Sequence, residues 1–297
     1  MGNRWEEIRA LYGAALDDAL RRNVADALAE DVGSGDLTGQ LVPEGPPRRA
    51  RVIVREDTVL CGVPWFNEVM RSVDPTLRIE WHKHDGDRMA PNDVVCEIVG
   101  PARSLLTAER NALNFIQLLT GVATTTRRYV DRVEGTRARI RDTRKTMPGL
   151  RLAQKYAVRV GGGDNHRLAL YDGILIKENH IAAAGGVGPA VDAALAIGRR
   201  VRESEGRDLS IQVEVESIAQ LREALEHHAT SILLDNFTFE MMREAVSVTG
   251  DRAVLEVSGS VNLDTVRQIA ETGVDRISIG TLTKDVKAGD FSMRIID

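Results

Sequence analysis

The second half of the chain alternates short apolar segments with helical ones, and it does so six times. The apolar segments read "ARIRDTRK", "DGILIKEN", "LSIQVEVES", "SILLDNF", "AVLEVSGS" and "DRISIGTLT". The last four recur about every 22 residues, which is the length of a strand followed by a helix. Such a repeat predicts parallel strands joined by right-handed crossovers. A run as apolar as "SILLD" indicates a strand buried on both faces, as in a barrel or a doubly wound sheet.

The residues at the ends of these six segments favour the barrel. In chain order they are Lys145, Lys177, Glu214, Asp235, Ser258 and Gly280. The strand ends of a barrel all meet at one mouth, whereas an open sheet uses only the pair at its switch point. Six chemically distinctive ends in succession therefore predict an incomplete, six-stranded parallel α/β barrel (TIM-like) with a functional site at its mouth.

The first part of the chain has a different rhythm. Residues 48–100 alternate apolar and polar positions in short runs that Pro, Gly and Asn-Asp interrupt, which predicts a small antiparallel sheet. A helix over 64–72 is expected to pack on this sheet. Residues 104–133 carry apolar positions at helical spacing and predict one long helix that links the two parts.

Positive charge gathers in one stretch of a chain whose net charge is −5. Residues 139–180 hold nine Lys/Arg and four Asp/Glu, a net of +5, while the remainder carries −10. The predicted mouth collects five possible donors: Arg144, Lys145, His166, Arg167 and Lys177. So many cations repel one another unless a ligand with several negative charges lies among them. Arg binds carboxylate or phosphate with paired hydrogen bonds and Lys acts as a point charge, so the set suits both groups.

Glu214 and Asp235 place carboxylates beside this basic cluster. Such carboxylates could hold Mg²⁺ bridging phosphates, bind ribose hydroxyls, or stabilise a cationic sugar in a dissociative transition state. The small-residue segments 258–260 and 279–281 supply backbone N–H groups where barrels commonly bind phosphate. A structural explanation stands beside each functional one: the carboxylates as strand-end caps, and His166 as a histidine satisfied by its own hydrogen bonds.

Composition argues against several classes of function. Aromatic residues make up 4% and the net charge is negative, which disfavours a base-stacking nucleic-acid surface. Cys61 and Cys96 lie in apolar stretches without a CxxC spacing, and we interpret them as buried structural thiols. The N-terminal segment reads as an amphipathic helix rather than a targeting signal, and no apolar run approaches the ~20 residues of a membrane span. We therefore expect no nucleic acid, no membrane, and a cytoplasmic protein.

Several motifs resemble, in order and spacing, the quinolinate phosphoribosyltransferase family. They are "ALAEDVGSGDLT", "ERNALNFIQLLTGVAT", "RDTRKTMPGLRLAQKYAVRVGGGDNHR", "DGILIKENHI", "EVE", "LLDNF", "EVSGS" and "ISIGTLT". The similarity covers the chain from about residue 25 onward. It implies an N-terminal α+β open-faced sandwich with the linking helix over 1–120, the barrel over 121–283, and a tail over 284–297 that returns to the N-terminal domain.

The resemblance also implies an activity. Such an enzyme, a pentosyltransferase of NAD biosynthesis, transfers the phosphoribosyl group of 5-phosphoribosyl-1-diphosphate to quinolinate with Mg²⁺. Diphosphate and CO₂ leave, and nicotinate mononucleotide is formed. Lys145, Glu214 and Asp235 would be catalytic, and Mg²⁺ would be held through the diphosphate, with Glu214 and Asp235 as candidate ligands. The implied substrate-binding residues are Arg110, Thr143, Arg144, Lys145, His166, Arg167, Lys177, Glu214, Asp235, Ser258, Gly259, Ser260 and Gly280.

The resemblance further implies homodimers, or assemblies of dimers, in which Arg110 reaches into the neighbour's site. The loop "SGS" departs from the family, where a second glycine is common, so Ser260 puts the width of the phosphate loop in doubt. Two alternatives stay open: a related pyrophosphorylase with another acceptor, such as nicotinate, and a non-catalytic nucleotide sensor. The set of Arg144, Arg167 and Lys177 argues against the sensor, because a dicarboxylate acceptor is what needs so many cations.

Overall fold

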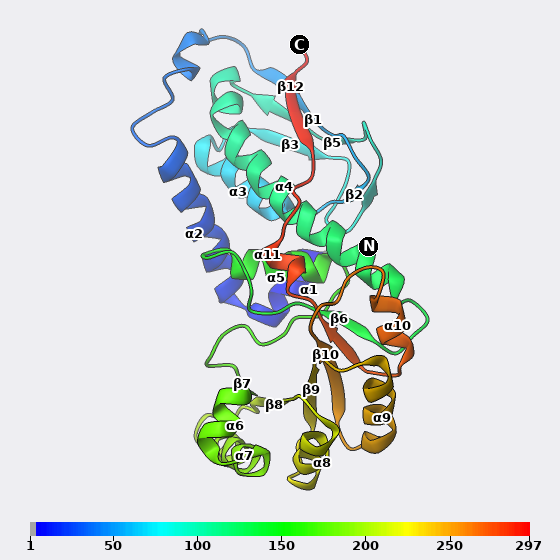
Figure 1. Cartoon of the computed structure of the whole chain (residues 1–297). Coiled ribbons are helices and arrows are strands. Elements are labelled where there is room, and N and C mark those ends of the chain that lie inside the picture. The colour runs from blue at the N-terminus through cyan, green and yellow to red at the C-terminus, as the bar shows by residue number, and fades with distance from the viewer. Residues whose placement is uncertain (1–3) are drawn as a thin grey trace. The chain divides into compact units, whose positions relative to one another are not determined.

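A computed structural model describes residues 4–297 and divides the chain into two compact units (Figure 1). Unit 1 comprises the chain up to Arg127 together with Thr146–Gly162 and Thr281–Asp297. Unit 2 comprises Arg128–Lys145 and Gly163–Gly280. The sequence segments predicted as domains are continuous, whereas each unit is assembled from separate stretches. The helix that follows the first barrel strand, α5 (Arg151–Val160), therefore falls in unit 1.

Unit 1 contains a four-stranded antiparallel sheet and a separate two-stranded one. The order in the larger sheet is β12 (Phe291–Ile295), β1 (Arg48–Val54), β5 (Val94–Gly100) and β3 (Arg78–Trp81), and the smaller sheet pairs β2 (Thr58–Val59) with β4 (Arg88–Met89). Ala50, Val52 and Val54 are buried along β1, while Arg49 and Arg51 between them are exposed. This alternation gives the sheet one apolar and one charged face. The predicted antiparallel sheet is confirmed.

Two helices cover the apolar face of this sheet. They are α3 (Val63–Val73), which buries Trp65 and Phe66, and α4 (Ala102–Arg132), which buries Leu105 and Ile116 in the same core. Both helices were predicted from the sequence, over 64–72 and over 104–133, and both are confirmed. The other helices of unit 1 are α1 (Arg4–Tyr12), α2 (Ala14–Asp31), the short 3-10 helix η1 (Gly39–Leu41), α5 and α11 (Thr281–Lys284).

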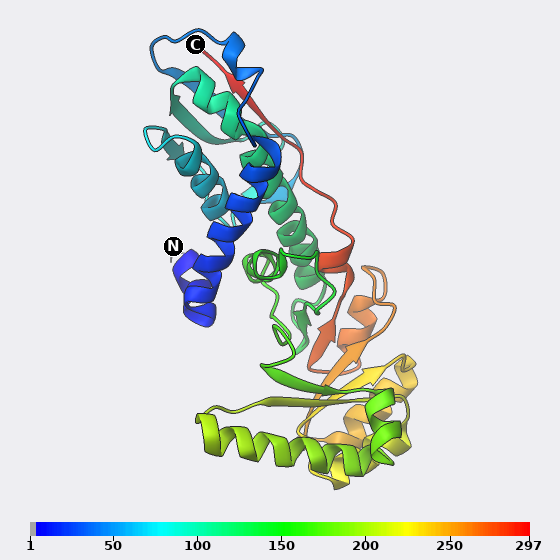
Figure 2. The same cartoon turned by 90° about the vertical axis from the view of Figure 1, so that its left-hand side faces the viewer.

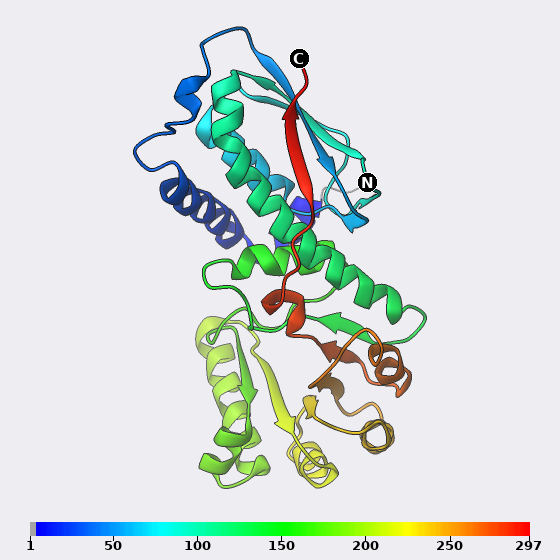
Figure 3. The ribbon, with the colours of Figure 1, turned by 45° about the horizontal axis from the view of Figure 1, so that its top comes forward.

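The C-terminal tail completes the sheet of unit 1. β12 pairs antiparallel with β1, with Val52 opposite Met293, and Figures 1 and 3 show the two strands side by side. On its way there the tail crosses α4 so closely that a Cβ added at Gly121 would collide with the carbonyl oxygen of Lys287. Glycine at this position therefore permits the approach of two backbones.

Unit 2 is built on a six-stranded, wholly parallel sheet. The order is β6 (Arg139–Arg141), β11 (Arg276–Ser278), β10 (Val254–Ser258), β9 (Ser231–Asp235), β8 (Ser210–Val215) and β7 (Gly173–Ile176). The consecutive strands β6 and β7 form the two edges of the sheet. One isolated bridge, Arg141 with Asp164, adds to the β6 edge. The barrel is incomplete because β6 and β7 do not pair with each other, and the chain between them contributes α5 to unit 1. The predicted fold class is confirmed.

The register divides the strands of unit 2 into two faces. Ile140, Ile277, Val257, Leu234 and Val215 lie opposite one another across five strands, and all are buried. Helices cover this face: α6 (Glu178–Ala184), α7 (Val187–Glu205), α8 (Ile218–Glu226), α9 (Phe239–Thr249) and α10 (Val266–Glu271). Figure 2 shows α7 lying along the sheet. The other face carries polar side chains, several of them buried, where a barrel interior is usually filled with branched apolar ones.

Both cysteines are free and buried in unit 1, as the sequence predicts. Burial raises the pKa of the Cys61 thiol well above its ordinary value, and it raises that of Cys96 too. Both thiols are therefore protonated and unreactive. Within residues 4–297, no single helix is long and apolar enough to cross a membrane, and the pair α6 and α7, bent by 95°, passes by length and composition only.

Candidate active site

The chemistry-bearing residues predicted from the sequence follow the carboxyl ends of the strands in unit 2. Asp235 ends β9, Ser258 ends β10, and Glu214 lies one residue before the end of β8. Lys177 comes directly after β7, and Gly280 lies two residues beyond β11. Because the six strands are parallel neighbours, these positions share one edge of the sheet. β6 ends earlier than expected, at Arg141, so Thr143, Arg144 and Lys145 belong to the loop that follows it.

Two arginines, Arg144 in the loop after β6 and Arg167 in the turn before β7, lie near enough to repel each other and keep unused hydrogen-bond donors. The Nε atoms of Arg144 and Arg167 are buried and have no hydrogen-bond partner. Burial, and next the positive charge of Arg144, lowers the pKa of Arg167 below its usual value. Two like charges held together with unsatisfied donors are costly unless an anion joins them.

The turn before β7 fixes Arg167 from two sides. Its backbone N–H donates to the Nδ1 atom of His166 at 2.8 Å, and one terminal guanidinium nitrogen donates to the carbonyl of Gly173 at 2.8 Å. The other ring nitrogen of His166 lies 2.9 Å from the Oε1 atom of Gln212. Arg167 is thus held in place while its buried Nε–H has no hydrogen-bond partner.

Lys177 and Glu214 form an ion pair across β7 and β8. The Nζ atom of Lys177 lies 2.9 Å from the Oε2 atom of Glu214, whose side chain is 11% exposed against 46% for the lysine. The predicted cation and the predicted carboxylate therefore neutralise each other here. Lys177 has enough freedom to be shared with an anionic ligand, whereas Glu214 stays with the strand.

Asp235 and the segment 258–260 meet at the ends of β9 and β10. The Ser258 hydroxyl donates to the Oδ1 atom of Asp235 at 2.8 Å. Gly259 has φ 125°, and a Cβ there would lie 2.9 Å from the Oδ1 atom of Asn236. Only glycine fits such a position without strain, so the turn requires its middle residue. Gly259 and Ser260 are exposed.

The loop after β6 lies beside Gly280, just beyond the end of β11. A Cβ added at Gly280 would lie 3.0 Å from the Cδ atom of Lys145 and 3.7 Å from the Oγ1 atom of Thr143. The Thr143 hydroxyl accepts the backbone N–H of Lys145 at 3.0 Å. A side chain at position 280 would therefore push Lys145 away, and the absence of one keeps the lysine along this edge.

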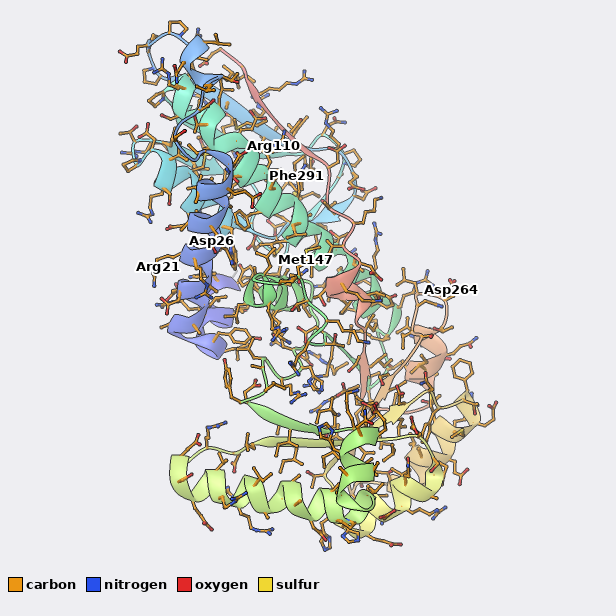
Figure 4. All side chains as sticks on the ribbon, turned by 60° about the vertical axis from the view of Figure 1, so that its left-hand side comes forward. Arg21, Asp26, Arg110, Met147, Asp264 and Phe291 are labelled. Carbon is orange, nitrogen blue, oxygen red and sulfur yellow. The ribbon has the colours of Figure 1, made fainter. Side chains whose placement is uncertain are left out.

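Arg110 is the one predicted site residue that belongs to unit 1. Figure 4 labels it on α4. It is exposed and lines a cleft of about 570 Å³ together with Thr107, Leu106 and the segment 31–42. Leu37 and Leu41 in this segment are 81% and 82% exposed. The two leucines and the arginine place apolar and cationic groups together on this surface.

Comparison with known families is decisive. The C-terminal domain of quinolinate phosphoribosyl transferase matches residues 122–294, and the N-terminal domain of the same family matches residues 36–120. The chain belongs to the quinolinate phosphoribosyl transferase family. The resemblance found in the sequence is therefore confirmed.

Individual relatives agree with this assignment. The chain is 40% identical over 266 residues to the probable nicotinate-nucleotide pyrophosphorylase (carboxylating) of Bacillus subtilis, which covers 90% of both proteins. It is 39% identical to quinolinate phosphoribosyltransferase (decarboxylating) 2a, mitochondrial, of Nicotiana tabacum, over 91% of this chain and 80% of the relative. The solved nicotinate-nucleotide pyrophosphorylase of Francisella tularensis superposes with a TM-score of 0.87 at 42% identity, covering 94% and 96% of the two chains.

The Mg²⁺ that the family resemblance implies would have to fit the carboxylates at the strand ends. No cluster of three or more His, Cys, Asp or Glu side chains suited to a metal occurs among residues 4–297. Glu214 and Asp235 supply separate carboxylates. Mg²⁺ is usually held by one or two carboxylates together with substrate phosphates and water, rather than by a cage of protein ligands. The residues present therefore fit a metal that arrives with a diphosphate.

Sequence reasoning missed the polar side chains beneath these strand ends. Arg141, Gln212, Glu256 and Ser278 share the polar face of the sheet, and the last three are buried. A signal for them exists: a charged or amide residue in the middle of a strand that is otherwise apolar, as in "AVLEVSG" and "SIQVEV". Such a residue is buried, and a buried polar group needs partners.

Proposed function

We propose that this chain transfers the phosphoribosyl group of 5-phosphoribosyl-1-diphosphate to the ring nitrogen of quinolinate and releases diphosphate and CO₂, giving nicotinate mononucleotide. The observation that carries the proposal is the pair of buried Nε–H groups, on Arg144 and Arg167, without a hydrogen-bond partner. A dianion satisfies both donors and removes the repulsion between the two guanidinium groups. Relatives that are named as decarboxylating quinolinate phosphoribosyltransferases support this acceptor.

The acceptor would lie over Arg144 and Arg167. Each guanidinium would bind one of its two carboxylates with paired hydrogen bonds. Lys177 would move partly from Glu214 toward the ligand, since its side chain is nearly half exposed. A monocarboxylate would leave one buried donor unsatisfied, and such a donor costs about 1–3 kcal/mol. The site would therefore select for two adjacent carboxylates.

The donor would lie toward β8 to β11. Glu214 and Asp235 would face the ribose hydroxyls, with the backbone N–H groups of 258–260 and the loop at Gly280 on the 5-phosphate. Mg²⁺ bound through the diphosphate, with Glu214 or Asp235 as its protein ligand, would neutralise charge on the leaving group. Lys145 would contact the diphosphate, because it lies beside Gly280 and Thr143.

Transfer would proceed by displacement at the anomeric carbon. The bond from C1 to the diphosphate oxygen breaks and the electron pair leaves with diphosphate, while the lone pair of the ring nitrogen forms the new bond to C1. Holding the two reactants in line supplies much of the rate. Lys145 would stabilise the leaving group most when its charge is fully developed, and such differential binding lowers the barrier.

Loss of CO₂ would follow without a nucleophilic side chain. Once the nitrogen carries the ribose it is cationic, and the bond from the adjacent ring carbon to its carboxylate can break. The electron pair stays on that carbon next to the positive nitrogen, and a proton then replaces the lost group. The neighbouring carboxylate remains bound to an arginine and keeps the ring in place.

We also propose that the protein acts as a homodimer in which Arg110 reaches into the site of the second copy. The exposed Leu37 and Leu41 beside Arg110 support an interface at this surface. Arg110→Ala should weaken quinolinate binding about tenfold, as expected for one lost ionic hydrogen bond, and leave the fold intact. Calorimetric titration with quinolinate measures this change, and unchanged affinity would remove Arg110 from the site.

Mixing two defective variants tests the sharing itself. When Arg110→Ala and Lys145→Ala chains form hybrid dimers, one of the two shared sites regains both native residues. Random exchange of subunits should then restore about a quarter of the native sites. No gain above the two separate variants would mean that each site uses its own Arg110. Larger assemblies of dimers and a cytoplasmic location stay predictions.

Turnover tests the proposed reaction. The chain is incubated with 5-phosphoribosyl-1-diphosphate, Mg²⁺ and either quinolinate or nicotinate, and mass spectrometry follows CO₂ and the mononucleotide. We expect product and CO₂ from quinolinate only. Product from nicotinate alone would identify a related pyrophosphorylase with another acceptor, and binding without turnover of either acid would identify a sensor.

A further inference from the structure

A chain of hydrogen bonds runs through the polar face of the sheet in unit 2 and ends at Arg167. It begins at Glu256 on β10, which is fully buried. The Arg141 guanidinium donates to the Oε2 atom of Glu256 at 2.6 Å, and the Ser278 hydroxyl donates to Oε1. Burial raises the pKa of Glu256, whereas the charge of Arg141 and the hydrogen bonds from Ser278 and Gln212 lower it. The ion pair with Arg141, at 2.6 Å, holds the carboxylate in its charged form. Glu256 is therefore ionised.

Gln212 on β8 connects this carboxylate to His166. Its Nε2 atom donates to the Oε2 atom of Glu256 at 3.1 Å. An ionised carboxylate can only accept hydrogen bonds, so the amide nitrogen of Gln212 must face Glu256 and its oxygen must face His166. The Oε1 atom of Gln212 lies 2.9 Å from the Nε2 atom of His166. That ring nitrogen must then carry the proton, because an amide oxygen only accepts.

The second nitrogen of the His166 ring is also engaged. Nδ1 lies 2.8 Å from the backbone nitrogen of Arg167 and accepts its hydrogen. An Nδ1 atom that accepts a hydrogen bond carries no proton, so the ring is neutral. With both nitrogens used by the protein, neither is left to bind an anion, although the sequence suggested His166 as one of the donors around the ligand.

We propose that Glu256 and Gln212 are positioning residues, which hold His166 as the neutral Nε2–H tautomer so that its Nδ1 atom fixes the backbone of Arg167. This inference rests on the proposed function, since it assigns Arg167 to the dicarboxylate acceptor. The direction of each hydrogen bond follows from the charge of Glu256. The charge sets the orientation of the Gln212 amide, the amide sets the tautomer of His166, and the bare Nδ1 atom of His166 accepts the backbone N–H of Arg167. Hydrogen bonds on the polar face of the sheet thereby fix the position of Arg167 in the turn before β7.

Protonation of His166 would break this arrangement. A second proton on Nδ1 would face the Arg167 N–H and expel it. The charges around the ring are those of Arg141, Arg167, Asp142 and Glu256, with the Oε1 atom of Glu256 3.9 Å from Nε2. Attraction to the two carboxylates favours the extra proton, while the two arginines and the lost hydrogen bond oppose it. If His166 instead bound the ligand as a cation, acid would strengthen quinolinate binding.

The variant Gln212→Met tests the chain without leaving a buried charge unpaired. Methionine has a similar shape and keeps Glu256 bound to Arg141, but it breaks the link to His166. We expect the dissociation constant for quinolinate to rise about tenfold, the cost of one lost buried hydrogen bond and a looser Arg167. The KM for 5-phosphoribosyl-1-diphosphate should stay within about twofold, because that substrate does not use Arg167.

A matched control makes the same chemical change elsewhere. Gln117→Met on α4 removes one long hydrogen bond, 3.4 Å to the carbonyl of Phe291, in unit 1. Its quinolinate affinity should equal that of the unmodified protein. Glu256→Gln is a second test, because its amide can turn Gln212 around and force a proton onto Nδ1. Equal affinity in Gln212→Met and Gln117→Met would overturn the proposal.

The tautomer can be read directly in the unmodified protein. Nitrogen NMR on histidine-labelled chain, with His166 assigned by its loss in His166→Asn, distinguishes protonated from bare ring nitrogens. We expect Nε2 protonated and Nδ1 bare at neutral pH. A protonated Nδ1 would contradict the proposal even if the variants failed to fold. If the unmodified chain does not bind quinolinate, the proposed function fails, while the tautomer still tests the chain of hydrogen bonds on its own.

Discussion

Arginines serve opposite purposes in the two units. On the charged face of the antiparallel sheet, Arg49 and Arg51 both bind Glu97 across β1 and β5, at 2.8 and 2.7 Å. In the loops that flank β6 and β7 of the parallel sheet, Arg144 and Arg167 lie near enough to repel each other and keep buried Nε–H groups without a partner. In the first arrangement each charge has its partner, and in the second the two guanidinium groups leave donors that the proposed ligand would satisfy.

The two units also differ in how each holds a carboxyl group away from water, Asp85 in unit 1 and Glu256 in unit 2. In unit 1, Asp85 accepts from the Tyr156 hydroxyl at 2.6 Å and from the backbone N–H of Val63 at 3.1 Å, and both donors are neutral. Burial raises the pKa of Asp85 to about 6. In unit 2, Glu256 is bound to Arg141 and stays ionised. Unit 1 holds its half-buried acid with neutral partners, whereas unit 2 holds its fully buried acid with an arginine.

The largest effect is expected for Lys145→Ala. Its loss should lower kcat about 10²–10³-fold, because in the proposed mechanism the lysine stabilises charge that develops on the leaving diphosphate. Lys287→Ala removes a lysine from unit 1 whose side chain is 81% exposed, and it should leave kcat unchanged. Steady-state rates at saturating substrate measure both. A normal rate in Lys145→Ala would remove this lysine from the catalytic group.

A second pair of variants compares the two kinds of arginine directly. Arg167→Ala should weaken quinolinate binding about 100-fold, since ionic hydrogen bonds to a carboxylate are lost. Arg51→Ala should leave binding unchanged and alter the free energy of unfolding by no more than about 1 kcal/mol, as usual for an exposed ion pair. Titration calorimetry and urea unfolding distinguish these outcomes. Similar losses of quinolinate affinity in both variants would contradict the expectation that only the arginine of unit 2 binds the ligand.

The smallest effect concerns the stability of unit 1. The pKa of Asp85 is raised in the folded state, so its contribution to stability is present in acid and is lost as the pH rises from about 4 through 6. Asp85→Asn should therefore gain stability relative to the unmodified chain over this range. The gain should be about 1 kcal/mol, because the residue as a whole is only half-buried. Urea unfolding at several pH values measures it, and a constant difference would contradict the expectation.

Much of this architecture could be predicted from the sequence because strands and helices repeat regularly. The spacing of "LSIQVEVES" to "DRISIGTLT" predicts the parallel strands, and each strand end brings a residue to the same edge. The ionic contacts within that edge could not be predicted. Whether Lys177 forms an ion pair with Glu214 depends on the side-chain rotamers and on the register of β7 against β8. Neither can be read from the order of apolar and polar residues in the sequence.

The polar interior escaped prediction for another reason. A Glu or Gln inside an apolar strand is visible in the sequence, but its partners come from other strands. Glu256 meets Arg141 from β6 and Gln212 from β8, which are distant in the chain and brought together by the register. The packing of α5 in unit 1 is likewise set by tertiary contacts. Its apolar positions would suit the outer helix layer of a barrel equally well.

The central claim is that Arg144 and Arg167 await a ligand with two carboxylates. The most direct test compares the binding of quinolinate and nicotinate to the unmodified chain and to Arg167→Ala by titration calorimetry. The account predicts that the unmodified chain binds the dicarboxylate about 100-fold more tightly, and that Arg167→Ala reduces this preference to a few-fold. Equal affinity of the unmodified chain for the two acids would contradict it.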